Sequence, residues 1–300
     1  ENVEKEKGII GQEIRMYDDD PDWRNFFGLI ENMYHNHPVK IDIAGTIESI
    51  SKITKDLLYE CYETFYHPSN MHVFIVGPVS PSEMMAIVED NQAGKDFKPM
   101  KTIERFFADE PETVAQKKQV IQLPVKTSKC LVGFKEQKTG RKGEDLLQHE
   151  LAVNLLLDLM FGQGSDDYEA LYNEGLIDQS FSFDYTEEHE FGFSMIGGNT
   201  DNPDLLADRL FEVTEKYRKR GIHETLFKKI QKKMIGSVLR SFNSLEYIAN
   251  QYTRYQFNQA NLFQVTGMLE NMKLNDVEKV LFEHFKDEAF TTCQVVPKDT

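Results

Sequence analysis

Cysteine, tryptophan and long apolar runs are scarce in this sequence. The three cysteines, Cys61, Cys130 and Cys293, are an odd number, lie far apart and form no C-x-x-C pair. Disulfide frameworks and thiolate zinc sites use even or closely spaced sets of cysteines. The cysteine content therefore argues against both kinds of site. It is typical of a reducing compartment, and we expect a cytoplasmic protein.

Basic residues are also under-represented. The chain has 34 Lys and Arg against 50 Asp and Glu, a formal net charge of -16. Nucleic acids and anionic membranes are bound through an excess of Lys and Arg, so neither is expected as a partner. No stretch is apolar over the roughly 20 residues of a membrane-spanning helix, and no secretory signal precedes the first helical pattern. Because the chain starts without methionine, we expect the natural protein to begin upstream.

Helix and strand patterns, in contrast, are plentiful. Apolar residues from Val3 to Tyr17 recur at intervals of three, four and seven, which predicts an amphipathic helix. Asp20 and Pro21 are residue types that begin helices, and a second helix is predicted after them. Further elements of this part are predicted as helices at 46–50, at 54–65 and from Ser80 onward, and as a buried strand at 71–76.

Residues 91–116 lose this periodicity and carry glycine, proline and scattered charges, which is typical of a linker. We place the linker at 96–116, a first domain within 1–95 and a second domain over 117–300. Strands and helices are mixed in both parts, which predicts an α+β fold. In the second domain, strands are predicted at 118–123, 129–134, 181–185, 190–197 and 290–296, and helices at 143–161, 167–173, 203–219, 223–244, 244–258 and 275–285.

Glu6 and Glu13 lie seven residues apart in the first predicted helix. Two helical turns separate them, so both carboxylates face the same side at different heights. Carboxylate oxygens bind zinc at about 2.0–2.2 Å, and a further carboxylate behind the ligands can orient them. Glutamates on a charged helix face are also common as plain solvated residues. The spacing alone leaves both interpretations open.

Three other stretches have some likeness to functional motifs. His35 and His37 have the spacing of metal ligands on a strand, but they end a helix before proline and no third ligand is near in sequence. His189 lies between two glutamates in a charged turn, which is typical of a solvated loop. The turn Gly162–Ser165 lacks the lysine that would complete a phosphate loop. None of them is expected to carry chemistry.

Several motifs in order resemble the insulinase and pitrilysin type of zinc peptidase. Residues Val3–Ile14 are similar to the family helix that follows the inverted zinc motif H-x-x-E-H and supplies the last zinc ligand. The likeness covers essentially the whole chain and is strongest over residues 3–90. The family's H-P, G-T-x-x-x-I, I-T and Y-x-P-x-N-M pattern recurs at His37–Pro38, Gly45–Ile50, Ile53–Thr54 and Tyr66–Met71.

The resemblance implies that Glu13 is a zinc ligand and that Glu6 supports the ligands from behind. The motif H-x-x-E-H, which supplies two histidine ligands and the general base, is absent from the 300 residues and lies upstream in the family. We therefore expect a fragment in which no catalytic residue is present. A catalytic zinc needs three protein ligands, so this fragment should hold no zinc by itself and should be inactive.

The family often binds substrate through an arginine and, seven residues later, a tyrosine. Leu171 and Asp178 stand at the positions that align with this pair, and neither side chain can donate to an oxyanion. Some bacterial members divide the site between two subunits, and this chain resembles the subunit that bears the zinc. The resemblance then implies a homologous subunit that supplies the arginine and tyrosine.

Together these features predict the function of the parent protein. It is expected to be a zinc metalloendopeptidase that hydrolyses unfolded peptides, with two related α+β halves of which the first is incomplete here. The alternative is a family member without catalysis that serves as a binding or scaffold subunit of a heterodimeric peptidase. Strands that lose their neighbours leave an exposed sheet edge, so self-association of the chain is also predicted.

Overall fold

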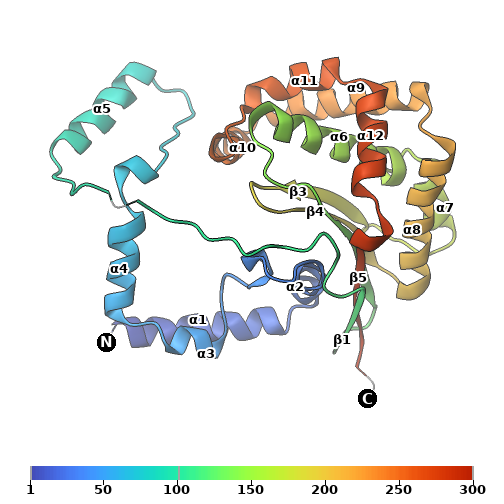
Figure 1. Ribbon diagram of the computed structural model, residues 1–300, viewed down its shortest axis with the longest axis horizontal. Coiled ribbons are helices and arrows are strands. Elements are labelled where there is room, and N and C mark those ends of the chain that lie inside the picture. The colour runs from blue at the N-terminus through green and yellow to red at the C-terminus, as the bar shows by residue number, and fades with distance from the viewer. Residues whose placement is uncertain (1, 101, 299–300) are drawn as a thin grey trace.

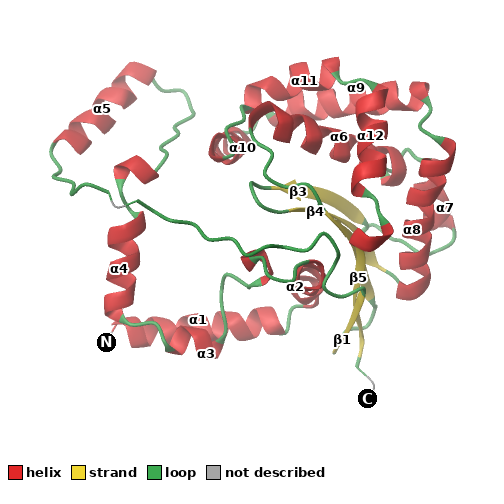
Figure 2. Cartoon of the chain, viewed as in Figure 1, coloured by secondary structure: helices red, strands yellow, loops and turns green. Residues whose placement is uncertain are grey.

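The computed structural model describes residues 2–100 and 102–298 (Figure 1). Within these residues the fold is α+β (Figure 2). It contains one five-stranded sheet, whose strand order is β1-β5-β2-β4-β3. β1 and β5 are parallel, and the other neighbouring strands are antiparallel. The strands are β1 (Lys118–Leu123), β2 (Lys129–Lys135), β3 (Ser182–Glu187), β4 (Gly192–Asn199) and β5 (Phe290–Pro297).

Helices make up most of the remaining structure. The α-helices are α1 (Asn2–Asp18), α2 (Pro21–Met33), α3 (Ile47–Ser51), α4 (Lys55–Phe65), α5 (Pro81–Ala93), α6 (Gly143–Phe161), α7 (Asp166–Asn173), α8 (Pro203–Arg220), α9 (Glu224–Ser241), α10 (Leu245–Phe257), α11 (Val265–Asn271) and α12 (Leu274–His284). Four 3₁₀ turns occur in the described residues, at Pro38–Lys40, Pro68–Asn70, Leu262–Gln264 and Asp287–Ala289. None of the helices in the described ranges is long and apolar enough to span a membrane.

Two layers of helices cover the sheet. The helices α6, α8 and α12 lie against one face, together with α9 and α11, which pack on α6 (Figure 1). α6 is apolar around most of its circumference, and this explains why it is buried in the centre of the larger core. The opposite face is covered by α2, whose Leu29 and Met33 have no exposed surface and pack beside Cys293 of β5.

The position of α2 depends on local sequence and on one glycine. Asp20 begins the helix by accepting hydrogen bonds from the backbone N–H groups of Asp22 (2.8 Å) and Trp23 (3.0 Å). A Cβ atom at Gly133 of β2 would lie 2.0 Å from the terminal methyl group of Met33. A side chain at position 133 would require Met33 to move, so glycine favours the close approach of the helix to the sheet. Although the sequence analysis assigns α2 to the first domain, α2 shares a core with β4 and β5 of the second part. The domain boundaries therefore stay a prediction.

The sequence-based prediction of a buried strand at 71–76 is wrong. These residues pair with no strand within the described chain, and Val73 is 65% exposed. A strand needs a neighbour to satisfy its backbone groups, and apolar sequence cannot replace one. The other predicted strands form, and the predicted helices form within a few residues of their expected ends. α11 is the helix that the sequence analysis did not predict.

The linker stays a prediction as a domain boundary, but the stretch between Gly94 and residue 117 contains neither helix nor strand among the described residues, which leave out residue 101. Its second half is nevertheless fixed to the rest of the chain. The backbone N–H of Val114 donates to the carbonyl of Glu288 (3.2 Å), and that of Gln116 donates to the carbonyl of Asn32 (2.9 Å). The linker therefore joins α2 to the end of the second part.

Candidate zinc site

The helix that carries the two candidate carboxylates is held by its neighbour α3. Gly11 and Ile14 are the buried residues of α1, and a Cβ atom at Gly11 would lie 3.3 Å from Ile47 of α3. The apolar stripe of α1 thus faces inward, as its periodicity predicts. Most of the polar residues of α1 lie on its other, exposed faces.

Glu6 and Glu13 are both exposed on α1. A helix advances 1.5 Å per residue, so the two positions lie about 10 Å apart along the axis and point within about 20° of each other. The phenol of Tyr17 donates a hydrogen bond to Glu13 (3.2 Å), and this bond raises the pKa of the Tyr17 hydroxyl. The helix places both carboxylates on one side, and the assignment of Glu13 as a ligand and of Glu6 as a group further out rests on the family resemblance.

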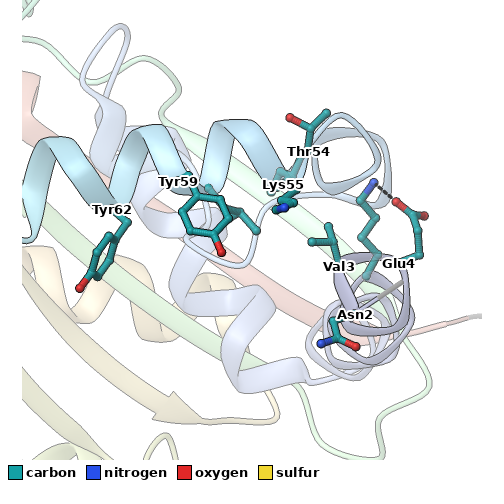
Figure 3. Close-up of a pocket in the computed structure, with 10 residues that line it drawn as sticks. Asn2, Val3, Glu4, Thr54, Lys55, Tyr59 and Tyr62 are labelled. Carbon is teal, nitrogen blue, oxygen red and sulfur yellow. Dashed lines mark hydrogen bonds and ion pairs between the residues drawn. The ribbon is translucent and has the colours of Figure 1, made fainter.

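A cleft of about 930 Å³ opens between the start of α1 and α4. Figure 3 shows Val3 and Glu4 at the start of α1, with Tyr59 and Tyr62 projecting from α4. Lys7 bonds to Glu4 (2.8 Å) at its edge and also reaches the carbonyl of Ser51 (3.1 Å). Aromatic and apolar lining with a few polar groups is typical of a surface that binds small molecules or peptides.

The donor set on α1 is incomplete as a metal site. No group of three or more His, Cys, Asp or Glu side chains that could hold a metal ion occurs in residues 2–100 and 102–298. The Glu13 carboxylate is accessible and accepts one hydrogen bond among these residues, so it suits one position of a zinc site. A zinc site that used Glu13 would need ligands other than those of the described residues.

His37, His189 and the turn Gly162–Ser165 make local contacts that do not involve Glu13. His37 is buried, accepts a hydrogen bond from the backbone N–H of Val39 (3.1 Å) and stacks on Phe107. His189 is half-buried and pairs with Glu190. The turn Gly162–Ser165 ends in a serine that caps α7. The structure therefore brings none of them together with Glu13.

A clamp around Lys135 joins the linker to the sheet and was not predicted. Lys135 is buried and donates to Glu110 (2.5 Å) and to two linker carbonyls, while its ammonium group lies 4.9 Å from the centre of the Tyr34 ring. Glu110 also accepts from the backbone N–H groups of residues 35–37 at 2.7–2.8 Å. Burial would raise the pKa of Glu110, but these bonds outweigh it and hold the pKa at about 2. We call Tyr34, Glu110 and Lys135 the linker clamp.

A second group of buried polar side chains lies inside the second part. Glu136 accepts hydrogen bonds through Oε2 from His149 (3.0 Å), His284 (3.0 Å) and Tyr185 (3.2 Å). The Tyr185 hydroxyl is also 2.9 Å from Oε2 of Glu187. We call these five residues the carboxylate cluster. Its members lie up to 148 residues apart in the chain, so no local motif could have revealed it.

Comparison with known proteins places the chain in a family. Residues 52–234 match the family model described as the peptidase M16 inactive domain, which is more than half of the chain. The chain belongs to the M16 peptidase family. This confirms the resemblance to insulinase and pitrilysin type zinc peptidases.

Individual M16 relatives agree with this assignment. An uncharacterized zinc protease of Bacillus subtilis (strain 168), YmfH, is 52% identical over 298 residues, which is 99% of this chain and 69% of that protein. A crystal structure described as that of an M16-like peptidase from Alicyclobacillus acidocaldarius has a TM-score of 0.95 at 40% identity and matches 99% of this chain and 71% of that chain. The same Bacillus strain has a relative named as a probable inactive metalloprotease, YmfF, 29% identical over 134 residues, 44% of this chain and 30% of that protein.

Leu171 and Asp178 stand at the positions that align with the arginine and tyrosine of the family. Leu171 is 1% exposed and is part of the apolar core, and Asp178 accepts hydrogen bonds from the backbone and hydroxyl of Ser180. Neither side chain presents a donor to solvent. A donor pair for substrate, if this protein uses one, therefore has to lie at other positions or in another subunit.

Proposed function

We propose that this chain is the larger part of a cytoplasmic zinc metalloendopeptidase of the M16 family that cleaves unfolded peptides. The observation that carries the proposal is Glu13, an accessible carboxylate on a helix that resembles the zinc-ligand helix of the family. The cleft beside α4 supports it, because it offers an apolar and aromatic surface near that helix. The three cysteines are free, in keeping with a reducing compartment.

The residues of this chain would contribute binding and positioning. Zinc, when bound, supplies a Lewis acid and a water of lowered pKa. Glu13 would be one of its three protein ligands, and Glu6 would orient a ligand from about two turns away. The two histidine ligands and the general base would come from an H-x-x-E-H segment upstream. Without that segment, we expect the 300 residues to be inactive.

We further propose that the active form is a heterodimer with a homologous subunit. The buried Leu171 and the turn-forming Asp178 offer no donors for an oxyanion, so a partner would supply them. The presence of a relative named as a zinc protease and another named as inactive in one Bacillus strain supports such a pairing. The alternative is that this protein is itself the non-catalytic subunit, which the match to an inactive-domain model favours.

Zinc content decides between these two functions. The experiment uses the protein extended upstream to the length of its Bacillus relative, alone and as the Glu13→Gln and Glu48→Gln variants. Glu48 is an exposed glutamate on α3 and serves as the control. We expect about one zinc per chain in the extended protein and in Glu48→Gln, and far less in Glu13→Gln because a direct ligand is lost. Glu6→Gln should weaken zinc binding about 10–100-fold.

Cleavage of a quenched unstructured peptide should follow the zinc content. If the extended protein binds no zinc, the non-catalytic subunit replaces the peptidase as the proposed function. If Glu13→Gln keeps both zinc and cleavage, the peptidase stands but the ligand assignment is wrong. Cleavage that appears only when a homologous subunit is added would support the divided site.

Self-association of the 300 residues is a separate prediction. Met71, Val73 and Ile75 lie on the unpaired segment 71–76 and are each about half exposed or more. Unpaired backbone groups beside exposed apolar side chains are a template for pairing with another chain. Light scattering should show a mass above that of one chain at high concentration. Val73→Lys should reduce the mass, whereas Leu205→Lys on the exposed side of α8 should not; a strictly monomeric chain would contradict the prediction.

A further inference from the structure

The carboxylate cluster contains two carboxyl groups, those of Glu136 and Glu187, beside the guanidinium of Arg141. Arg141 bonds to Glu187 (2.8 Å) and to Glu136 (3.5 Å). Glu187 and His284 have no exposed surface, and Glu136 is 3% exposed. An unbalanced charge is costly in such surroundings. One proton on a carboxyl group balances the charges of Glu136, Glu187 and Arg141.

Hydrogen-bond geometry shows where that proton belongs. The Tyr185 hydroxyl lies between the Oε2 atoms of Glu187 (2.9 Å) and Glu136 (3.2 Å). A hydroxyl has one hydrogen, so it can donate to only one of two ionised carboxylates. If Glu187 is protonated, it donates to the Tyr185 oxygen and Tyr185 donates to Glu136. Both contacts are then true hydrogen bonds.

The electrostatic environment of the two carboxyl groups supports this placement. Burial would raise the pKa of Glu136, but hydrogen bonds from His149 and His284 outweigh burial and keep the pKa well below its usual range. Burial raises the pKa of Glu187 to about 7, although Arg141 acts against it. Glu136 therefore stays ionised, and Glu187 is the group that gains or loses a proton near neutrality.

Glu187 is the last residue of β3 and leads into the turn 188–191. Arg254 of α10 donates to the carbonyl of Glu187 (3.0 Å) and to the side chain of Glu188 (2.8 Å). On the other side of the turn, Tyr34 of the linker clamp donates to the carbonyl of Gly192 (2.8 Å) and accepts from its N–H (3.2 Å). Contacts to α10 and to α2 thus meet at one turn.

We propose that the carboxylate cluster binds one proton and that this proton holds the turn 188–191 in the position that joins α2 and α10. When the proton leaves, Glu136 and Glu187 repel each other across the Tyr185 hydroxyl, and the turn loosens. The linker clamp and α10 then lose a common support. This role is independent of zinc and of peptide cleavage.

Protons can reach the cluster from solvent. A cleft of about 410 Å³ is lined by Arg141, His149 and Glu283, among other residues, so one member of the cluster, His149, also lines the cleft. The charged and titratable groups near Glu187 are Glu136 after β2, Arg141 before α6 and His149 on α6, and His284 on α12 bonds to Glu136. Lys138 and Glu283 pair with each other at the outer edge (2.9 Å).

The sign of the pH effect follows from the raised pKa of Glu187. A group that binds its proton more tightly in the folded state stabilises the fold below its unfolded pKa, and the effect is lost as pH rises through its folded pKa. Burial lowers the pKa of His149, which acts in the opposite direction in the same range. The useful quantity is therefore the ratio of folding equilibrium constants between the parent chain and Glu187→Gln.

We expect this ratio to fall by roughly tenfold or more between pH 5 and pH 7.5 and then to level off, measured by urea unfolding. The glutamine side chain of this variant mimics the protonated carboxyl group and cannot ionise. Glu283→Gln is the control, because this carboxyl is paired at the edge and should show no such change over the same range. A ratio that stays constant within about twofold would overturn the proposal, since Glu187 would then not exchange its proton on folding.

Hydrogen exchange on the parent chain gives a second test that needs no variant. The amides of Glu188 and Gly192 donate within the turn and to Tyr34. Between pH 6 and pH 8, after correction for intrinsic rates, their protection should decrease several-fold more than that of Val132 in the middle of β2. Equal loss at all three amides, or no loss, would overturn the proposed local role of the proton.

Discussion

Replacement of Lys135 by methionine should lower the free energy of unfolding by about 3 kcal/mol. Removing one partner of a buried ion pair leaves the other charge uncompensated, which costs roughly 3–5 kcal/mol. The value should lie at the lower end here, because Glu110 keeps three backbone N–H donors from residues 35–37 and is partly exposed. The variant also frees two linker carbonyls that Lys135 now binds.

Urea unfolding of a double-mutant cycle measures this effect. The cycle combines Lys135→Met with Glu110→Gln, and the two changes together should cost less than the sum of the separate changes by about 1–3 kcal/mol. Lys52→Met is the matched control, since Lys52 pairs with Glu48 at 2.8 Å but both side chains are more than 70% exposed. We expect less than about 1 kcal/mol there. Equal losses at Lys135 and Lys52 would show that the linker clamp does not stabilise the chain.

Local signals explain why so many helices were predicted correctly. Asp20, Thr54 and Ser80 each accept a hydrogen bond from the first turn of the helix that follows, so the residue type at the cap marks the start. The family motifs are local in the same sense. Their order along the chain predicted the M16 family without knowledge of any contact.

Structural features that depend on distant partners were either not predicted or predicted wrongly from the sequence. The segment 71–76 has the composition of a strand, but strand formation depends on a neighbour that the described residues do not provide. α11 contains Gly267 and has no side-chain cap, so its sequence carries a weak helix signal. The assignment of Glu6 and Glu13 to a zinc site comes from the resemblance and stays a prediction, and the structure adds only their exposure and spacing.

The buried polar groups are hidden from sequence for a related reason. Glu136 is bonded to His149, 13 residues away, and to His284, 148 residues away. Lys135 and Glu110 are 25 residues apart across a linker that looked unstructured. Each residue type is ordinary on a protein surface, and only the fold makes it buried. The linker clamp and the carboxylate cluster could therefore be found only in three dimensions.

Gly197→Ala should be among the most destabilising single-methyl changes in the sheet, with an expected loss of about 3 kcal/mol or more. Gly197 lies in β4 opposite Leu131 of β2 and has a backbone φ of 155°. A Cβ atom there would lie 2.0 Å from the carbonyl oxygen of Cys130 and 3.0 Å from the Cα atom of Leu131. These are backbone atoms of the neighbouring strand, so they cannot rotate away as a side chain would.

Gly236→Ala is the matched control, because it adds the same methyl group in a different setting. Gly236 lies within α9, and no atom lies within 4 Å of a Cβ atom built there. Alanine favours a helix over glycine by about 1 kcal/mol, so the midpoint of urea unfolding should rise for Gly236→Ala and fall for Gly197→Ala. Equal midpoints for Gly197→Ala and the parent chain would mean that β2 and β4 can separate locally. Because Glu136 follows β2 and Ser194 of β4 bonds to His284 (2.9 Å), such a separation would also change the carboxylate cluster.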